Sequence, residues 1–129
     1  MDDLYRGWSG LEEASGFIED VVMPARRDAQ PVRWQRFDWA TQQLADWHEI
    51  PATADLIIEG CGSITRSTTA HADLSIWINA DDEARKEWAL SRGGEDFERH
   101  WNLWDIQFQR FREEHAPERY ASLVVRQSR

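Results

Sequence analysis

The sequence has 129 residues and a formal net charge of −9, from 15 Lys and Arg against 24 Asp and Glu. This acidity argues against a nucleic-acid partner, which normally meets a basic face, and no apolar run is long enough to cross a bilayer. The length suits a single domain over 1–129, and the lone Cys61 excludes an internal disulfide, which fits a reducing cytoplasm. We therefore expect a cytoplasmic protein with neither a nucleic-acid nor a membrane partner.

The chain begins with Asp2-Asp3-Leu4-Tyr5, which places two carboxylates close to an aromatic ring. A carboxylate accepts the proton of a hydroxyl group, so this motif is a candidate site for a sugar hydroxyl and a metal-bound phosphate. A solvated chain end is the alternative. After a Gly-containing loop, apolar residues at helical spacing predict a helix over about 11–27, with acidic side chains in its first turn and basic ones near its end.

Residues 32–50 follow Pro31 and predict a β-hairpin or a pair of extended arms, with a turn at 38–41. Next, Leu56-Ile57-Ile58 runs straight into Glu59-Gly60. A short continuous apolar run is typical of a parallel-sheet strand buried on both faces, and 74–79 predicts a second such strand. Ligands of open α/β sheets bind at the carboxyl ends of the strands, so Glu59 is a candidate to orient a Mg²⁺-bound water. A strand-terminal Glu in a surface loop is the alternative.

The last third of the chain predicts a helix over about 83–91, a hinge at Gly93-Gly94, a long helix over about 96–114 and a short strand at 122–125. Aromatic residues recur at helical spacing in the long helix, and we expect them in the core. Arg85, Arg92 and Arg99 lie seven residues apart around the glycines, as in a phosphate clamp on a mobile lid. A solvated helix face with pairing to acidic neighbours is the alternative.

The four histidines, His48, His71, His100 and His115, have no metal-ligand spacing, so the sequence predicts no zinc site. Cys61 is expected to be a small buried residue, because no histidine near it in the sequence supports its activation as a nucleophile.

Taken together, these segments resemble the uridine-kinase-like P-loop nucleoside kinases. Asp-Asp-Leu-Tyr at 2–5 resembles the family's Asp-x-Phe-Tyr motif, and Phe37-Asp38-Trp39 is similar to the Tyr-Asp segment that lines its nucleoside pocket. Ile57-Ile58-Glu59-Gly60 resembles the family's Val-Glu-Gly strand end, and residues 82–96 resemble its helix and lid. The segment 117–125 resembles the closing stretch, with Ser122 in the place of an Asp.

The resemblance implies an α/β fold, with a parallel P-loop-kinase-like sheet, helices on both of its faces and a lid over about 92–114. It implies catalytic roles for Asp2, Glu59 and Arg92, with Asp2 and Glu59 also at the Mg²⁺ ion. Asp2 would act as the base on the acceptor hydroxyl, and Arg92 would steady the transferring phosphate together with Arg85. It further implies that the nucleoside-like acceptor is bound by Asp3, Tyr5, Phe37, Asp38 and Arg85.

One departure limits this expectation, because no Gly-x-x-x-x-Gly-Lys-Ser/Thr occurs in the sequence. That loop cradles the phosphates of ATP. We therefore expect a chain truncated at its N-terminus, missing the first strand and the phosphate loop. The resemblance implies ATP and Mg²⁺ as cofactors of the intact family form, and the chain as written is expected to be inactive. A non-catalytic nucleotide- or partner-binding module is the alternative, as is a kinase-like enzyme with another acceptor, and a homo-oligomer is possible.

Overall fold

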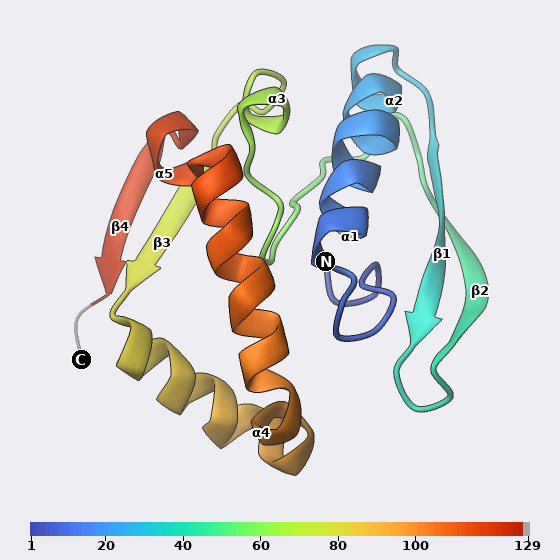
Figure 1. The fold of residues 1–129 in the computed structure, drawn as a ribbon. Coiled ribbons are helices and arrows are strands. Elements are labelled where there is room, and N and C mark those ends of the chain that lie inside the picture. The colour runs from blue at the N-terminus through green and yellow to red at the C-terminus, as the bar shows by residue number, and fades with distance from the viewer. Residues whose placement is uncertain (128–129) are drawn as a thin grey trace.

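A computed structural model describes residues 1–127 of the chain as a mixed α/β structure (Figure 1). Its helices and strands, in chain order, are α1 (Leu11–Phe17), the π-helical segment η1 (Ile18–Val22), α2 (Met23–Arg27), β1 (Val32–Asp38), β2 (Gln43–Ile50), α3 (Arg66–Thr69), β3 (Ile76–Ala80), α4 (Asp82–His115), α5 (Pro117–Tyr120) and β4 (Leu123–Gln127). No helix in the described part of the chain is long and apolar enough to cross a membrane.

The N-terminal helix runs continuously through α1, η1 and α2, as the apolar periodicity predicts. Its middle widens into a π-turn immediately before Met23-Pro24. Because proline has no N–H to donate to the preceding turn, a wider turn accommodates it there. The inner face carries Ile18 and Val22, which form one hydrophobic cluster with Met23 and Val32.

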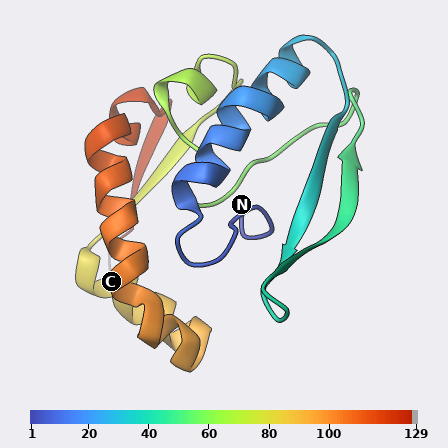
Figure 2. The same cartoon turned by 45° about the vertical axis from the view of Figure 1, so that its right-hand side comes forward.

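The predicted hairpin at 32–50 is confirmed as the antiparallel pair β1–β2. Val32 pairs with Ile50 at one end and Asp38 with Gln43 at the other, and the register shifts between Gln35 and Phe37. The hairpin lies along the N-terminal helix on the side away from α4 (Figure 2). Its inner side chains Val32 and Phe37 are buried, whereas most of β2 is exposed.

The predicted buried strand at 56–59 is wrong, because this segment pairs with no strand of the described chain. It is nevertheless extended, and Leu56 and Ile58 pack against the cluster around Ile18 while Ile57 is 91% exposed. A strand requires neighbouring backbone groups for its hydrogen bonds, and here side chains position the segment instead. Upstream, the Arg26 guanidinium donates to the carbonyls of Ala52 and Ala54, both at 2.7 Å.

The second sheet is the parallel pair β3–β4, with Ile76 beside Leu123 and Ile78 beside Val125. Ser75 and Ser122 hold the starts of the two strands together, since their hydroxyls lie 3.0 Å apart and the Ser122 N–H donates to the Ser75 hydroxyl at 2.9 Å.

The expectation of helices on both faces of the parallel sheet is wrong for this pair. On one face, Trp77 stacks on Phe108 of α4 with ring centroids 6.1 Å apart. On the other face, four apolar side chains are 42–62% exposed, namely Ile76, Ile78, Leu123 and Val125. Alternate residues of a strand point to opposite faces, so a single packed helix leaves the four apolar side chains of the opposite face uncovered.

Helix α4 contains both predicted C-terminal helices and bends at Gly94, whose backbone is non-helical (φ 62°, ψ −152°). The bend brings the two halves of α4 into a V in Figure 1. The expected aromatic core is confirmed in the second half, where Trp101, Phe108 and Phe111 are buried. Phe111 and Phe108 form a second hydrophobic cluster with Leu11 of α1. The stretch expected to be a lid therefore supplies part of the core.

Candidate functional site

The loop before α1 is placed by contacts with the turn that follows the extended segment 54–58. The N-terminal amino group donates to the Glu59 carbonyl at 2.8 Å, and the Tyr5 hydroxyl donates to the Cys61 carbonyl at 2.7 Å. The loop occupies the space between α4 and the hairpin, with the N-terminus near the middle of the molecule (Figure 2). The two motifs that the sequence separates by more than fifty residues are thus adjacent in the fold.

Gly60 makes this close approach possible. Its φ of +131° is a conformation that side chains disfavour. A Cβ at this position would lie 2.6 Å from Met1 Cβ and 3.0 Å from the Tyr5 hydroxyl oxygen. The structure thus shows that the N-terminal loop passes close to the backbone at Gly60.

Tyr5 is the buried centre of the site, with a side chain that meets Trp104 edge-on at 4.8 Å. Burial raises the pKa of its phenol far above the usual value, and the negative charges of Asp2 and Glu59 raise that pKa further. The phenol therefore stays protonated and keeps donating its hydrogen bond.

Cys61, expected from the sequence to be a small buried residue, is only partly buried. Burial is the main cause that raises the pKa of its thiol, and the charges of Asp2 and Glu59 act in the same direction. The positive charge of Arg85 and a hydrogen bond with Trp104 oppose the rise. A thiol held in its neutral form is a poor nucleophile.

The hairpin contributes its turn end to the same region. The Phe37 N–H donates to the Asp3 carbonyl at 2.8 Å, and the Trp39 indole N–H donates to the Asp2 carbonyl at 3.0 Å. One carboxylate oxygen of Asp38 accepts the Ala40 N–H at 2.9 Å. That oxygen stabilises the hairpin turn in the manner usual for Asp side chains.

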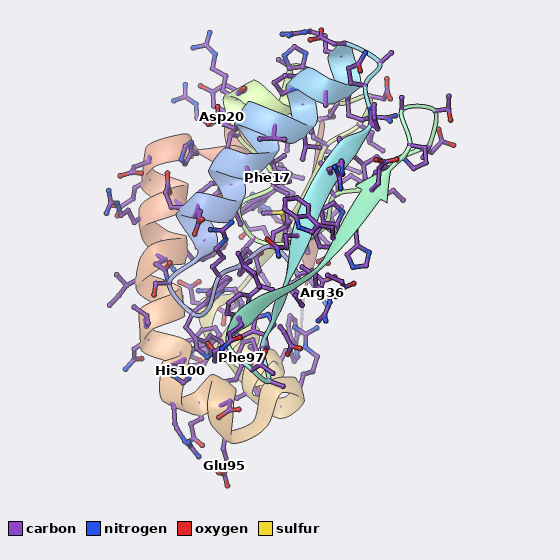
Figure 3. The ribbon with its side chains drawn as sticks, turned by 90° about the vertical axis from the view of Figure 1, so that its right-hand side faces the viewer. Phe17, Asp20, Arg36, Glu95, Phe97 and His100 are labelled. Carbon is purple, nitrogen blue, oxygen red and sulfur yellow. The ribbon has the colours of Figure 1, made fainter. Side chains whose placement is uncertain are left out.

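Trp8 connects this region to α4 through an aromatic cluster. Its ring stacks on His100 with centroids 4.7 Å apart and planes 4° from parallel, and it meets Phe97 and Trp39 edge-on at 4.9 and 5.2 Å. Figure 3 shows Phe97 and His100 close together on α4. The sequence analysis did not single out Trp8 and His100 as site residues. The large number of tryptophans was the signal in the sequence for such an aromatic cluster.

The predicted phosphate-binding arginines have different surroundings. Arg85 forms ion pairs with Asp82 and Asp105, and its guanidinium lies 4.5 Å from the Phe108 ring centroid and 5.1 Å from that of Trp101. It therefore ties the two halves of α4 together. Arg92 is exposed two residues before the bend at Gly94. Arg99 pairs with Glu95 at 3.0 Å, as on a solvated helix face.

The structure thus brings together six of the predicted residues, namely Asp2, Asp3, Tyr5, Phe37, Asp38 and Glu59. Arg85 lies close enough to affect the Cys61 thiol. In comparisons with known proteins, no family model matches the chain and no curated protein is significantly similar to it.

The carboxylates of Asp2 and Glu59 fit Mg²⁺, which is usually held by one or two carboxylates together with waters. Both residues are exposed, and the chain beside Asp2 meets the chain at Glu59 where the N-terminal amino group donates to the Glu59 carbonyl. The triphosphate of ATP is a different case. The sequence has no phosphate-binding loop, and Arg85 pairs with two aspartates, so Arg85 is not free to hold an ATP phosphate in this arrangement.

Proposed function

We propose that the chain forms the acceptor-binding part of a phosphotransferase acting on nucleoside-like hydroxyl compounds, as its resemblance to uridine-kinase-like P-loop kinases implies. The observation that carries the proposal is the contact between the loop that bears Asp2 and Tyr5 and the turn that bears Glu59. Phosphoryl transfer requires a phosphate-binding loop that this sequence does not contain. The 129 residues alone are therefore proposed to bind the acceptor without transferring phosphate.

In an enzyme that also has a phosphate-binding loop, Asp2 would accept the proton of the acceptor hydroxyl, which general-base catalysis requires. Glu59 and Asp2 together hold Mg²⁺, which would neutralise phosphate charge when bound. Asp3, Phe37 and the second carboxylate oxygen of Asp38 orient the acceptor. The buried Tyr5 hydroxyl is engaged by Cys61, so its part is to hold the turn at 59–61 against the loop.

Arg85 and Arg92 are proposed to contact the transferring phosphate, and each requires a local change to do so. Arg85 would have to exchange Asp82 or Asp105 for the phosphate, and Arg92 would have to approach through movement at Gly94. Bidentate pairing of a guanidinium with phosphate supports such an exchange.

The test is binding of Mg²⁺ and a panel of nucleosides, followed residue by residue in NMR spectra. We expect shifts at 2–5, 37–38 and 59–61, and their loss in Asp2→Asn. Asp28→Asn is a matched control, because Asp28 is exposed beside Arg27 after α2. Equal shifts in wild type and Asp2→Asn, or none with any nucleoside, would contradict the proposal.

A coupled assay tests the lack of transfer. We expect turnover well below about 1 per second, the low end for kinases. Faster turnover that disappears in Asp2→Asn would show that the chain supplies its own phosphate site.

The exposed apolar face of β3–β4 favours a second candidate, a partner-binding module without catalysis. Parallel sheets are normally covered on both faces, whereas Ile78 is 62% exposed. In sedimentation experiments, this candidate predicts self-association or partner binding that Ile78→Lys abolishes. A monomer at all concentrations, with nucleoside binding intact, favours the phosphotransferase instead.

A further inference from the structure

A mixed cluster of metal-ligating side chains lies where the first turn of α1 meets the end of α4, away from the site around Tyr5. It consists of Glu12, Glu114 and His115, each of which offers one ligand atom, and these atoms lie within 4.8 Å of one another. Glu12 is distant in sequence from the other two. The packing of α1 against α4 through Leu11 and Phe111 brings them together.

The imidazole of His115 has an unexplained nitrogen. Its Nε2 atom is shielded from solvent and has no hydrogen-bond partner among the described residues. The nearest oxygen of Glu12 is 3.7 Å away, which is too long for a hydrogen bond. The ring itself is held against Phe111 with centroids 4.6 Å apart. A buried polar atom without a partner is costly, and a neutral imidazole nitrogen is the commonest metal ligand in proteins.

The spacing and charge of the cluster suit a small divalent cation. Zinc bonds of about 2.0–2.2 Å to nitrogen and oxygen place tetrahedral ligands about 3.3–3.5 Å apart. The separation of 3.7 Å between His115 Nε2 and Glu12 is within a few tenths of an ångström of that spacing. Arg110 occupies one oxygen of Glu114 at 2.9 Å, which leaves the other oxygen available.

The cluster also borders an open surface hollow of about 590 Å³, which Glu114 and His115 help to line. His71 and Glu19 line the same hollow. A hollow of this size holds water molecules, which complete the coordination of a zinc ion that has three protein ligands.

We propose that Glu12, Glu114 and the Nε2 atom of His115 bind one Zn²⁺ ion together with water. The imidazole favours zinc over Mg²⁺ and Ca²⁺, which prefer oxygen ligands. The ion joins the start of α1 to the end of α4, so it stabilises the packing between them. The proposal is independent of the acceptor site.

The test is calorimetric titration of the untagged, metal-free chain with Zn²⁺, paired with thermal unfolding. We expect one Zn²⁺ per chain, affinity about tenfold or more weaker in His115→Gln and in Glu12→Gln, and a rise in Tm on zinc addition that both variants lose. His71→Gln is the matched control, because His71 lines the hollow outside the cluster. It should bind zinc as the wild type does.

Equal zinc affinity in wild type and both ligand variants would overturn the proposal, and so would loss of binding in His71→Gln alone. Circular dichroism of each variant without zinc shows whether it is folded. Should His115→Gln fail to fold, the exposed Glu12→Gln variant decides the question by itself.

Discussion

The N-terminal loop and the β3–β4 pair differ in how completely neighbouring elements bury their side chains. The loop has no regular structure, yet Tyr5 within it is 3% exposed and hydrogen-bonded to a segment far away in sequence. The two strands have regular structure, yet Ile78 on their open face is 62% exposed. Regular backbone geometry therefore does not indicate which part of this molecule is most tightly packed.

The difference follows from which partners each region has. The loop meets α4, the hairpin turn and residues 59–61 at once, so its side chains are enclosed without a hydrogen-bonded ladder. The parallel pair meets a helix on one face and solvent on the other. Burial here depends on the number of elements that converge, and the following experiments test that statement.

The largest difference in the free energy of unfolding is expected between truncation of a core side chain and truncation of a side chain on the open sheet face. Phe111→Ala removes a side chain that is completely buried between α4 and α1, and we expect a loss of about 3–5 kcal/mol in the free energy of unfolding. Ile78→Ala on the open sheet face should cost less than about 0.5 kcal/mol. Urea unfolding at low protein concentration measures both. A cost for Ile78→Ala comparable to that of Phe111→Ala would mean that a partner covers the sheet face.

Substitution of Gly60 should give the next largest effect. Gly60→Ala forces a side chain into a positive-φ conformation and against Met1 and Tyr5, so we expect a loss of about 1–3 kcal/mol in unfolding free energy. Gly16→Ala is the matched control, because Gly16 lies within α1 with open space around it. That change should stabilise the chain by about 0.5–1 kcal/mol. Similar effects of the two substitutions would show that the loop does not approach Gly60 closely in solution.

Alkaline unfolding tests the burial of the Tyr5 phenol. Its pKa in the folded chain lies above the value of about 10 in the unfolded chain. As pH rises past about 10, the unfolded chain loses a proton that the folded chain keeps, so stability falls by up to about 1.4 kcal/mol per pH unit. Tyr5→Phe should make stability fall less steeply with pH. The lost hydrogen bond should lower the free energy of unfolding at neutral pH by about 1 kcal/mol. Tyr120→Phe, at an exposed position, should leave the slope unchanged.

Amide hydrogen exchange should reveal the smallest difference, within α4 itself. Residues 90–96, which are mostly exposed, surround the non-helical Gly94, whereas residues 104–111 pack against α1 and the N-terminal loop. Local opening is easiest where few buried contacts hold a segment. We expect faster exchange at 90–96 than at 104–111, and equal protection of the two segments would argue against a hinge at the glycines.

The sequence by itself determined the elements whose pattern is local. Apolar residues at helical spacing give the N-terminal helix and the aromatic core of α4, and Pro31 and the turn near Asp38 delimit the hairpin. Helical periodicity and turn chemistry act within a few residues, so these features require no knowledge of the rest of the chain. The exception within α1–α2 is the π-turn before Pro24, which the periodicity does not reveal.

Only the tertiary structure decided how distant segments meet. The apolar run at 56–58 has the composition of a buried strand, but a strand is a relation between two segments, and the described chain provides none beside it. Likewise, the stacking of Trp8 on His100 and the approach of Glu12 to His115 depend on where α4 packs. The motifs at 2–5 and 59–60 were visible in the sequence, whereas their contact required the turn at Gly60. Spacing along the chain carries no information on such contacts, because they arise from packing between elements.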